Sequence, residues 1–501
     1  MHKLVAALAA IGALLALATS ASAGLIVGVN DDAAQDATVS TWFYATMQSE
    51  GLKLNALTLR WDDTDPSWIP QGSIAAIDQA IVKAKAAGVT VELDLYPLHS
   101  QAFTGGQRCA PSSNPQGCGN TAAIQAFATW TAEVAQTFPS VHEFVVMNEC
   151  NQPLFLNPQW DTSGANVSAE ICGRALAAAY DALHGVSSQN FVWGVGLSPR
   201  GNDNPNAASD SSTTPVRFLA DLGAWFRAFA AATHRTAPLM DGFDFHPYPV
   251  PQSLPFSVGY ANPNEASVSN LPRIYQAFYS GFAGSPQPTI GQQAGGGLPV
   301  SLNETGIQTA STGMPGYTGT EVSAGASGGV FGTFATPAYQ AQWYSQMLNL
   351  VACDPNVRVV NIFHLVDESN LAGWQSGLYY YSPTGTPQAK PSAQVVQSFI
   401  AGGARCTGTM QSWTPAGVAA PGAGTTTTAA VTAAGPRVCT GQTATKRKCA
   451  AYLRTNSRKL ATLNLQLKHA KGKLKTALRA KIARQRLTLE LANAAFHKLR
   501  H

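Results

Sequence analysis

The chain has 501 residues, of which 45% are hydrophobic and 12% are charged, and its formal net charge is +4. So large an apolar fraction can bury a substantial core, which excludes a chain that is disordered throughout. The small net charge conceals a division. Residues 437–501 hold 17 Lys and Arg and one Glu, a net charge of +16, whereas the other 436 residues hold 15 basic and 27 acidic residues, a net charge of −12. The sequence thus predicts an acidic body followed by a basic segment.

The N-terminus has the parts of a secretory signal peptide. Lys3 precedes an apolar run over residues 4–17, and Ala21-Ser-Ala23 stands directly before Gly24. A charged start, a short apolar stretch and an Ala-x-Ala end are typical of such peptides, although an N-terminal membrane anchor is the alternative. No later segment has 18 uninterrupted apolar residues, so we expect no transmembrane segment after residue 23. We predict a signal peptide over residues 1–23 and a secreted protein.

The eight cysteines favour disulfides over a metal site, because their number is even and no Cys-x-x-Cys spacing is present. Nearest-neighbour pairing is one of about 105 connectivities that eight cysteines allow. It would join Cys109 to Cys118, Cys150 to Cys172, Cys353 to Cys406 and Cys439 to Cys449.

Short β-branched runs alternate with Ala-rich amphipathic stretches from Gly24 to about Gly403, a pattern typical of parallel strands joined by helices. Eight strands are predicted, at Leu25–Val29, Ala56–Arg60, Thr90–Leu95, Glu143–Met147, Phe191–Gly196, Gly242–Phe245, Val300–Leu302 and Val359–Phe363. Helical patterns include Ser73–Ala87, Ala122–Thr137, Ser168–Leu183, Pro337–Leu350 and Ser392–Ile400. Eight such units close a (β/α)₈ TIM barrel, whose post-strand loops build the active site.

An open doubly wound sheet would give a similar alternation, but it usually has a Gly-rich phosphate turn after its first strand. Here that turn reads Gly28-Val-Asn-Asp-Asp32, which disfavours a nucleotide-binding fold. We therefore predict an α/β barrel domain over residues 24–412. Long loops at Pro199–Thr214 and Pro247–Asn270 are expected beside its site.

Two further segments follow the barrel. Residues 413–436 are predicted to be a linker, because all residues between Pro415 and Pro436 are Ala, Gly, Pro, Thr or Val. Residues 437–501 are predicted to be helical, as a hairpin near Gly472, because Leu and Ala recur at three- and four-residue spacing. Their basic charge suits an anionic cell-envelope polymer rather than nucleic acid, and a solvated segment without a specific partner is the alternative.

Two carboxyl groups are placed for chemistry. The run Glu143-Phe-Val-Val-Met-Asn-Glu149 is a short apolar strand that ends in Asn148 and Glu149, and Leu298-Pro-Val-Ser-Leu-Asn-Glu304 ends in a second carboxylate. In a closed barrel, the ends of strands four and seven face one another across the mouth. Two carboxyls about 5–5.5 Å apart suit retaining glycoside hydrolysis, in which one attacks the anomeric carbon and the other protonates the leaving oxygen.

These positions resemble clan A glycoside hydrolases, most of all family 5 and its family 39 relatives. The resemblance rests on the Asn-Glu pair after the fourth strand, the Glu of the seventh and the eight βα units. Other matching positions are Arg60 at the end of strand two, His246-Pro-Tyr248 after strand six and Trp374 after strand eight. Members usually have Asn-Glu-Pro, whereas Cys150 stands in place of the proline here, which suggests a local disulfide to Cys172.

The resemblance implies an O-glycosidase with Glu149 as acid/base and Glu304 as nucleophile, acting on an oligo- or polysaccharide without a cofactor or a metal. It further implies that Asn148 binds the sugar 2-hydroxyl and that Arg60 holds Glu304 ionised. His246 and Tyr248 would hydrogen-bond the nucleophile region, and Trp374 would lie beneath a sugar ring. Taken singly, His246 is equally well explained as a structural histidine and Trp374 as a loop anchor.

A barrel that binds carbohydrate without turnover is the alternative function, motivated by Cys150 and the basic segment. Asp62, Asp63 and Asp65 could suggest calcium, but they lack the ordered 12-residue loop, so solvated loop acids are favoured. The sequon Asn303-Glu-Thr305 is interpreted as a chance match, because a glycan there would block the cleft. Neither His-Glu-x-x-His nor Gly-x-x-x-x-Gly-Lys is present, which disfavours zinc proteases and NTPases.

Overall fold

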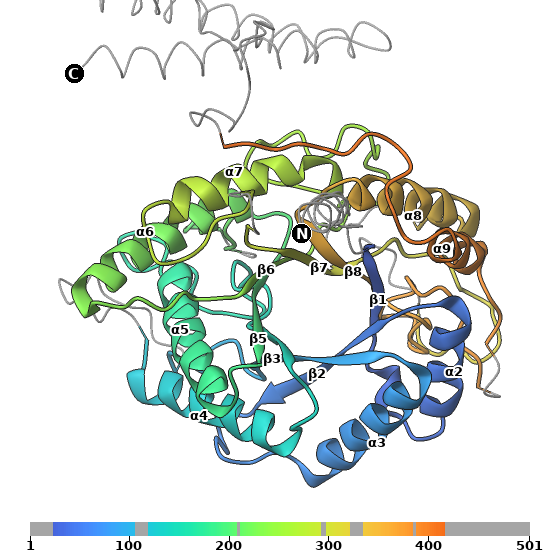
Figure 1. Ribbon diagram of the computed structural model, residues 1–501, viewed down its shortest axis with the longest axis horizontal. Helices are drawn as coiled ribbons and strands as arrows, with labels where there is room; N and C mark the ends of the chain where they lie inside the picture. Colours follow the sequence, from blue (N-terminus) through green and yellow to red (C-terminus); the bar gives the residue numbers. More distant parts are fainter. Residues whose placement is uncertain are drawn as a thin grey trace, which may run out of the picture. The chain divides into compact units, whose positions relative to one another are not determined.

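The computed structural model describes residues 24–105, 119–207, 211–291, 297–320, 334–383 and 387–415. In this part of the chain, eight parallel strands close into a barrel in the order β1 to β8. Figure 1 shows these strands as a ring with helices around its outside. The predicted (β/α)₈ barrel is therefore confirmed.

The strands all overlap the predicted ones; they are β1 (Ile26–Asn30), β2 (Leu54–Trp61), β3 (Thr90–Pro97), β4 (Glu143–Val146), β5 (Phe191–Leu197), β6 (Gly242–Phe245), β7 (Val300–Thr305) and β8 (Val357–Ile362). The helices of the described residues are η1 (Asp32–Gln35), α2 (Ser40–Glu50), α3 (Gln71–Ala87), α4 (Thr121–Thr137), α5 (Ser168–Val186), α6 (Pro215–Thr233), η2 (Val268–Asn270), α7 (Leu271–Phe282), α8 (Pro337–Ala352) and α9 (Pro391–Ala401). The sequence patterns single out five of the α-helices but not α2, α6 or α7.

The barrel has an apolar floor and a polar upper half. Side chains of β2 and β3 that point outward, such as Leu57 and Leu93, pack into the main core beneath the helices. Inward side chains near the start of the strands form a separate apolar cluster of Leu54, Ala56, Val145, Trp193 and Val359. Closer to the carboxyl ends, the buried side chains include Asp94, Asp244 and Asn303. Polar groups are thus concentrated at the end where barrel enzymes bind their substrates.

Two of the four predicted disulfides are confirmed. Cys150 is bonded to Cys172 and Cys353 to Cys406, with Cα–Cα distances of 6.2 and 4.6 Å. The other four cysteines, Cys109, Cys118, Cys439 and Cys449, lie outside the described residues. So do the predicted signal peptide and the predicted basic segment.

The last described residues still contact the barrel. Trp413 lies beyond the predicted end of the domain at residue 412, and its ring is 5.7 Å from that of Tyr275 on α7. Among the described residues, we find no helix that is both long enough and apolar enough to cross a membrane.

Candidate active site

Glu149 lies just after β4, where the backbone turns sharply. Its φ of 38° and the φ of 71° at Met147 fall in the left-handed region, which non-glycine residues rarely adopt. The Glu149 N–H donates a 2.8 Å hydrogen bond to the carbonyl of Gly196 on β5, and the Cys150–Cys172 disulfide ties the next residue to α5. The neighbouring elements therefore hold a strained turn in place, and strained turns concentrate at functional sites.

Glu304 lies within β7, near its carboxyl end. Val300 and Leu302 pack outward into the main core, so simple alternation would also place Glu304 outward. The pairing of β7 with β8 shifts register between Leu302 and Thr305, however, and such an irregularity re-aims the side chains around it. Glu304 consequently lines the same pocket as Glu149.

His246 lies between the two glutamates. Its Nδ1 atom is 3.3 Å from Glu149 Oε1 and 3.6 Å from Glu304 Oε2, and its Nε2 atom is 3.4 Å from Asp244 Oδ2. The His246 and Asp244 side chains are 1% and 0% exposed. Burial acts to lower the pKa of His246, but the charges and hydrogen bonds of its three carboxylate neighbours outweigh burial and raise the pKa well above its usual value. These neighbours therefore favour the protonated form of His246, whose Nδ1 atom lies near both glutamates.

The position of this nitrogen atom limits the distance between the two carboxylates. Because Glu149 Oε1 and Glu304 Oε2 lie 3.3 and 3.6 Å from the same nitrogen atom, the two oxygens cannot be farther apart than the sum of these distances. This maximum separation lies near the lower end of the roughly 6.5–9.5 Å between the carboxyl groups of inverting glycosidases. The roughly 5–5.5 Å separation of retaining glycosidases falls below the maximum and is therefore allowed.

Burial raises the pKa of Glu304 to about 7. The positive charge of His246 acts in the opposite direction, and the negative charge of Glu149 adds to the increase. The Tyr248 hydroxyl donates a 3.1 Å hydrogen bond to Glu304 Oε2, which stabilises the ionised carboxylate and lowers its pKa. Glu304 consequently holds its proton more tightly than an ordinary glutamate does.

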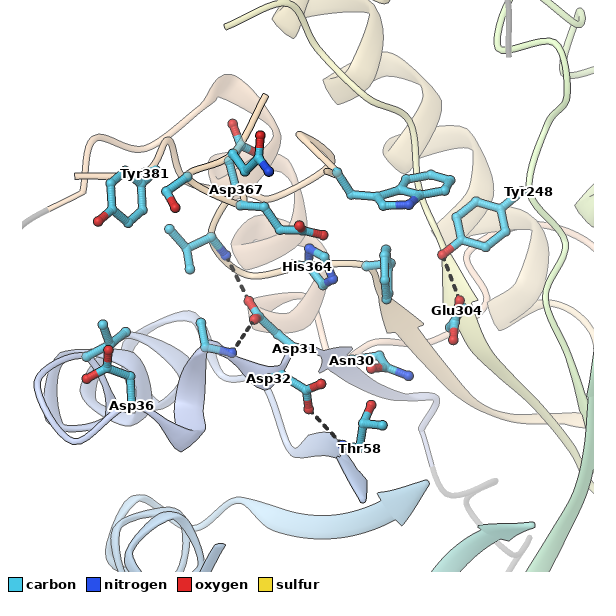
Figure 2. A pocket seen from close by; sticks show the side chains of 18 of the residues that line it. Asn30, Asp31, Asp32, Asp36, Thr58, Tyr248, Glu304, His364, Asp367 and Tyr381 are labelled. Carbon is cyan, nitrogen blue, oxygen red and sulfur yellow. Dashed lines mark hydrogen bonds between the residues drawn. The ribbon is translucent and has the colours of Figure 1, made fainter. Parts of the chain in front are cut away.

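Tyr248 and Trp374 form an aromatic wall beside Glu304, and Figure 2 shows the Tyr248 hydroxyl directed at the carboxylate. The ring centres of Tyr248 and Trp374 are 5.1 Å apart, and Phe363 packs against both rings edge-on. The Tyr260 hydroxyl fixes the backbone on this side, because it donates to the Tyr248 carbonyl at 2.8 Å. The flat face of an aromatic ring such as Trp374 can pack against the face of a sugar ring.

Arg60 was expected to hold Glu304 ionised by its charge. In the described chain, no hydrogen bond or ion pair joins the two residues, and Arg60 is exposed near the mouth of the barrel. Its positive charge instead acts to lower the pKa of Asp32 and of Tyr96. The charge that opposes the raised pKa of Glu304 comes from His246.

One pocket of about 1210 Å³ contains most of the predicted site residues. Asn148, Glu149, Tyr248, Glu304 and Trp374 all line it, and His246 contacts both glutamates from below. The pocket also exposes acidic residues that the sequence analysis did not assign to a site, namely Asp32 and Asp36 after β1 and Glu368 after β8. The sequence signal that could have assigned these three acids to the site is their position directly after predicted strands.

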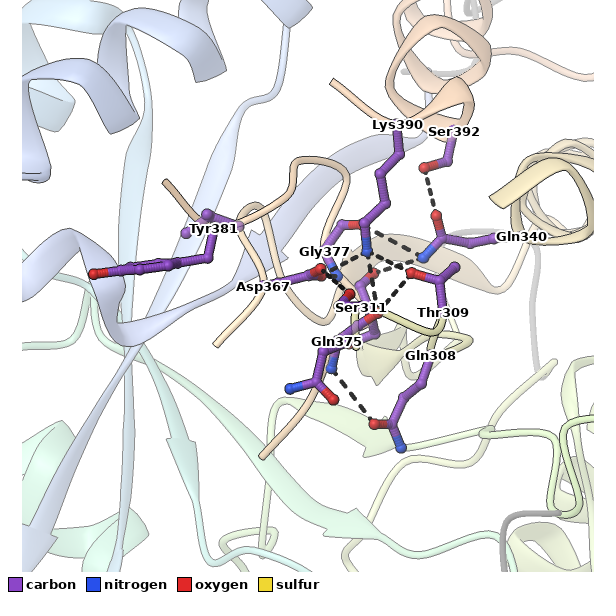
Figure 3. Close-up of polar contacts among 12 residues, drawn as sticks. Gln308, Thr309, Ser311, Gln340, Asp367, Gln375, Gly377, Tyr381, Lys390 and Ser392 are labelled. Atoms are coloured by element: carbon purple, nitrogen blue, oxygen red, sulfur yellow. Dashed lines mark hydrogen bonds and ion pairs between the residues drawn. The ribbon is translucent and has the colours of Figure 1, made fainter. Parts of the chain in front are cut away.

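A buried ion pair supports the loop after β8. Lys390 Nζ is 2.6 Å from Asp367 Oδ1, and both side chains are 0% exposed (Figure 3). The ammonium group also donates to Thr309 Oγ1 and to the Gln375 carbonyl. Burial lowers the pKa of Lys390 and raises that of Asp367, and each charge counteracts the shift of the other. Because Gln375 follows Trp374, this pair fixes the segment that carries the aromatic wall.

Two other sequence features can be placed. Asn303 is 1% exposed and its amide donates to Asp94 Oδ2 at 3.0 Å, so the sequon is inaccessible in the folded barrel. Asp62, Asp63 and His99 form a group whose potential metal-ligand atoms all lie within 4.8 Å of one another. His99 Nδ1 is already 2.6 Å from Asp63 Oδ1, and Asp62 accepts two hydrogen bonds from Thr64. These contacts fit a loop whose polar side chains hydrogen-bond to one another.

No model of a known protein family matches the sequence, and no curated protein matches it. Solved structures that resemble the fold include a family 39 glycoside hydrolase from Bacteroides cellulosilyticus WH2, with 13% identity and a TM-score of 0.46. This match covers 75% of this chain and 63% of that enzyme, so the chain spans less than two thirds of its length.

Two further resemblances are to the GH39 enzyme of Xanthomonas axonopodis pv. citri and to the β-glucosidase of Thermotoga maritima. The first has 15% identity and a TM-score of 0.45, and covers 76% of this chain and 67% of that one. The second has 10% identity and a TM-score of 0.46, and covers 75% of this chain and 98% of that one. All three structures are of glycoside hydrolases. The likeness concerns the barrel fold.

Proposed function

We propose that the protein is a glycoside hydrolase that cleaves β-linked O-glycosidic bonds by double displacement. The observation that carries the proposal is the convergence of Glu149 and Glu304, from the ends of β4 and β7, on one nitrogen atom of His246 at the bottom of a large pocket. The test is release of reducing sugar from aryl β-glycosides or β-linked polysaccharides by the intact chain. Carbohydrate binding without any release would favour the non-catalytic alternative.

The reaction needs two steps, and the two carboxyl groups suffice for both. The ionised Glu304 attacks the anomeric carbon while Glu149 gives its proton to the departing oxygen, so the glycosidic bond breaks as the glycosyl–enzyme bond forms. Glu149 then takes a proton from water, whose oxygen attacks the same carbon and expels Glu304. Asn148, which lines the pocket with Glu149, would bind the sugar 2-hydroxyl, and Trp374 would pack against the ring.

The assignment of Glu304 as nucleophile follows the resemblance and the Tyr248 hydrogen bond, which stabilises the ionised form. The raised pKa of Glu304 is the observation that would suit the opposite role, a proton donor. The pH dependence of activity separates the two roles, because a nucleophile must be ionised and a proton donor must be protonated.

We expect kcat/KM on an aryl glycoside to fall as the pH drops through about 7, the pKa of Glu304 in the free protein. In Tyr248→Phe, the carboxylate loses a hydrogen bond that lowers its pKa, so this acidic limb should move to higher pH. The measurement is the pH profile of both proteins. If the activity instead falls above pH 7 and this limb moves with Tyr248→Phe, Glu304 is the proton donor.

We also propose that the enzyme is secreted and held at the cell envelope by its basic segment. The signal-peptide pattern, the two disulfides and the +16 charge of residues 437–501 support this proposal. Many weak ionic contacts to an anionic polymer would be screened by salt.

Removing residues 437–501 should abolish retention on cell envelopes at low salt and leave hydrolysis of a small aryl glycoside unchanged. Sedimentation of envelopes with each protein at low and high salt measures the first effect. Equal retention of the full-length and shortened proteins would contradict an anchoring role for this segment.

A further inference from the structure

The pocket continues from the catalytic pair along a wall made by the loops after β1 and β8. Asp32 and Asp36 come from the first loop and Glu368 from the second. Figure 2 shows Asp32 between Glu304 and the more distant Asp36. The volume of about 1210 Å³ exceeds the roughly 300–1,000 Å³ of pockets that enclose a single small ligand. The acidic wall thus lies where a bound chain of sugars would continue away from the reacting bond.

These three carboxylates differ from the two acids behind them. Asp31 is 3% exposed and accepts hydrogen bonds from the Leu365 and Val366 N–H groups, and Asp367 is paired with Lys390. Asp31 and Asp367 thus hold the two loops together, and their carboxylates already have partners within the protein.

Asp32, Asp36 and Glu368, in contrast, are exposed, and none of them forms an ion pair within the described residues. Their side-chain partners are neutral: Asp32 accepts from the Thr58 N–H and Asp36 from Thr38.

The charges around this wall are unbalanced. Burial raises the pKa of Glu368, and the negative charge of Asp32 raises it further. The positive groups near the pocket are Arg60, which acts on Asp32, and Arg200, which lines the pocket. Lys390 is already paired. A ligand with positive charges would therefore relieve repulsion along this wall.

His364 adds a polar group without a complete set of partners beside this wall. It lines the same pocket, is 7% exposed, and its Nδ1 atom has no hydrogen-bond partner among the described residues. Burial, with the nearby charge of Lys390, lowers the pKa of His364 to about 3, so the imidazole is neutral and can accept a hydrogen bond. A ligand ammonium or hydroxyl group that reached this nitrogen atom would supply the partner that it lacks.

A single metal ion does not fit this wall. In the described chain, the group of three residues whose ligand atoms all lie within 4.8 Å is Asp62, Asp63 and His99, and it does not include the pocket acids. Asp32, Asp36 and Glu368 are therefore too dispersed to surround one ion. Positive charges along an extended ligand can each pair with a different one of these carboxylates.

We propose that the substrate is an oligosaccharide of β-linked amino sugars with free, protonated amino groups, which Asp32, Asp36 and Glu368 recognise. This inference rests on the proposed glycosidase function for the pocket, and it adds the chemical class of the sugar. Anionic sugars would be repelled by the same wall, and neutral ones would lack its ionic contacts.

The test compares ligands that differ in charge but share one backbone: a β-1,4-linked glucosamine tetramer, its N-acetylated counterpart and the neutral glucose tetramer. Dissociation constants are measured by calorimetry at mildly acidic pH with the full-length Glu304→Gln protein, which removes turnover. We expect the glucosamine tetramer to bind at least about tenfold more tightly than the other two, since each exposed ion pair contributes modestly. At about 1 M salt, where the Debye length is about 3 Å, this preference should shrink.

The decisive comparison adds Asp32→Asn, Asp36→Asn and Glu368→Gln together, which should bring the ratio of the dissociation constants close to one. The matched control is Asp78→Asn, which removes an exposed carboxylate on α3 and should keep the preference. The proposal would be overturned if the protein with Asp32, Asp36 and Glu368 intact bound the three tetramers equally. It would also be overturned if the preference survived the triple substitution.

The glycosidase function is tested separately. Hydrolysis of neutral glycosides by the wild type, without a preference for amino sugars, would leave that function standing and refute this specificity. A strong preference for binding the glucosamine tetramer, without hydrolysis of any tetramer, would support the specificity and refute the glycosidase function.

Discussion

Replacing Glu304 by Gln is expected to lower kcat/KM on an aryl β-glycoside by several orders of magnitude, because the amide cannot form the covalent intermediate. Replacing Glu149 by Gln is expected to lower it by about 10²–10⁴-fold, the usual contribution of a positioned proton donor. Both variants keep the volume of the side chain. The measurement is steady-state kinetics with a series of aryl leaving groups.

The two variants should differ in their response to the leaving group. A highly acidic phenol departs without protonation, so the loss of bond-cleaving activity in Glu149→Gln should shrink with that substrate, while Glu304→Gln stays inactive. Azide added to the Ala variants gives a second distinction. It would replace Glu304 with a single inversion at the anomeric carbon, whereas in Glu149→Ala it would attack the glycosyl–enzyme and give net retention.

Glu133→Gln on α4 makes the same chemical change outside the pocket and should leave the kinetics unchanged. A Glu304→Gln protein with wild-type activity would refute the assignment. A reversed azide outcome, with retention from Glu304→Ala and inversion from Glu149→Ala, would exchange the two roles.

The fold and the approach of Glu149 to Glu304 could be predicted because both follow from local patterns and from the closure of the barrel. Barrel strands are short β-branched runs, and each predicted run overlaps an observed strand. The carboxyl ends of parallel strands meet at one rim of a closed barrel, so Glu149 and Glu304 could be expected to face each other. The Cys150–Cys172 disulfide was likewise suggested by the residue that replaces the usual proline.

The detailed side-chain contacts within the site could not be predicted. The register shift in β7 that frees Glu304 from simple alternation depends on its pairing with β8. His246 was expected near the nucleophile, but its equal approach to Glu149 follows from the turn after β4. Arg60 has the expected position in the sequence, yet its charge acts on Asp32. The acidic wall likewise appears only when the barrel closes and brings β1 beside β8.

Replacing Lys390 by Met is expected to lower the free energy of unfolding by about 3–5 kcal/mol, because it leaves the Asp367 carboxylate buried without its cation. Asp367 would keep the hydrogen bonds from the Gly377 N–H and the Tyr317 hydroxyl, which cannot replace a charge. Since the pair fixes the segment that carries Trp374, KM should rise as well. Denaturant unfolding with the disulfides intact measures the first effect, and steady-state kinetics the second.

The double variant with Lys390→Met and Asp367→Asn should lose less stability than the two single variants combined, because no uncompensated charge remains in the interior. Arg217→Met breaks an exposed i,i+4 pair with Asp221 and provides the control, with an expected loss of only about 0.3–0.5 kcal/mol. If Lys390→Met is no more destabilising than this control, the loop after β8 does not depend on the ion pair. The position of Trp374 would then have to come from its ring packing against Tyr248 and Phe363.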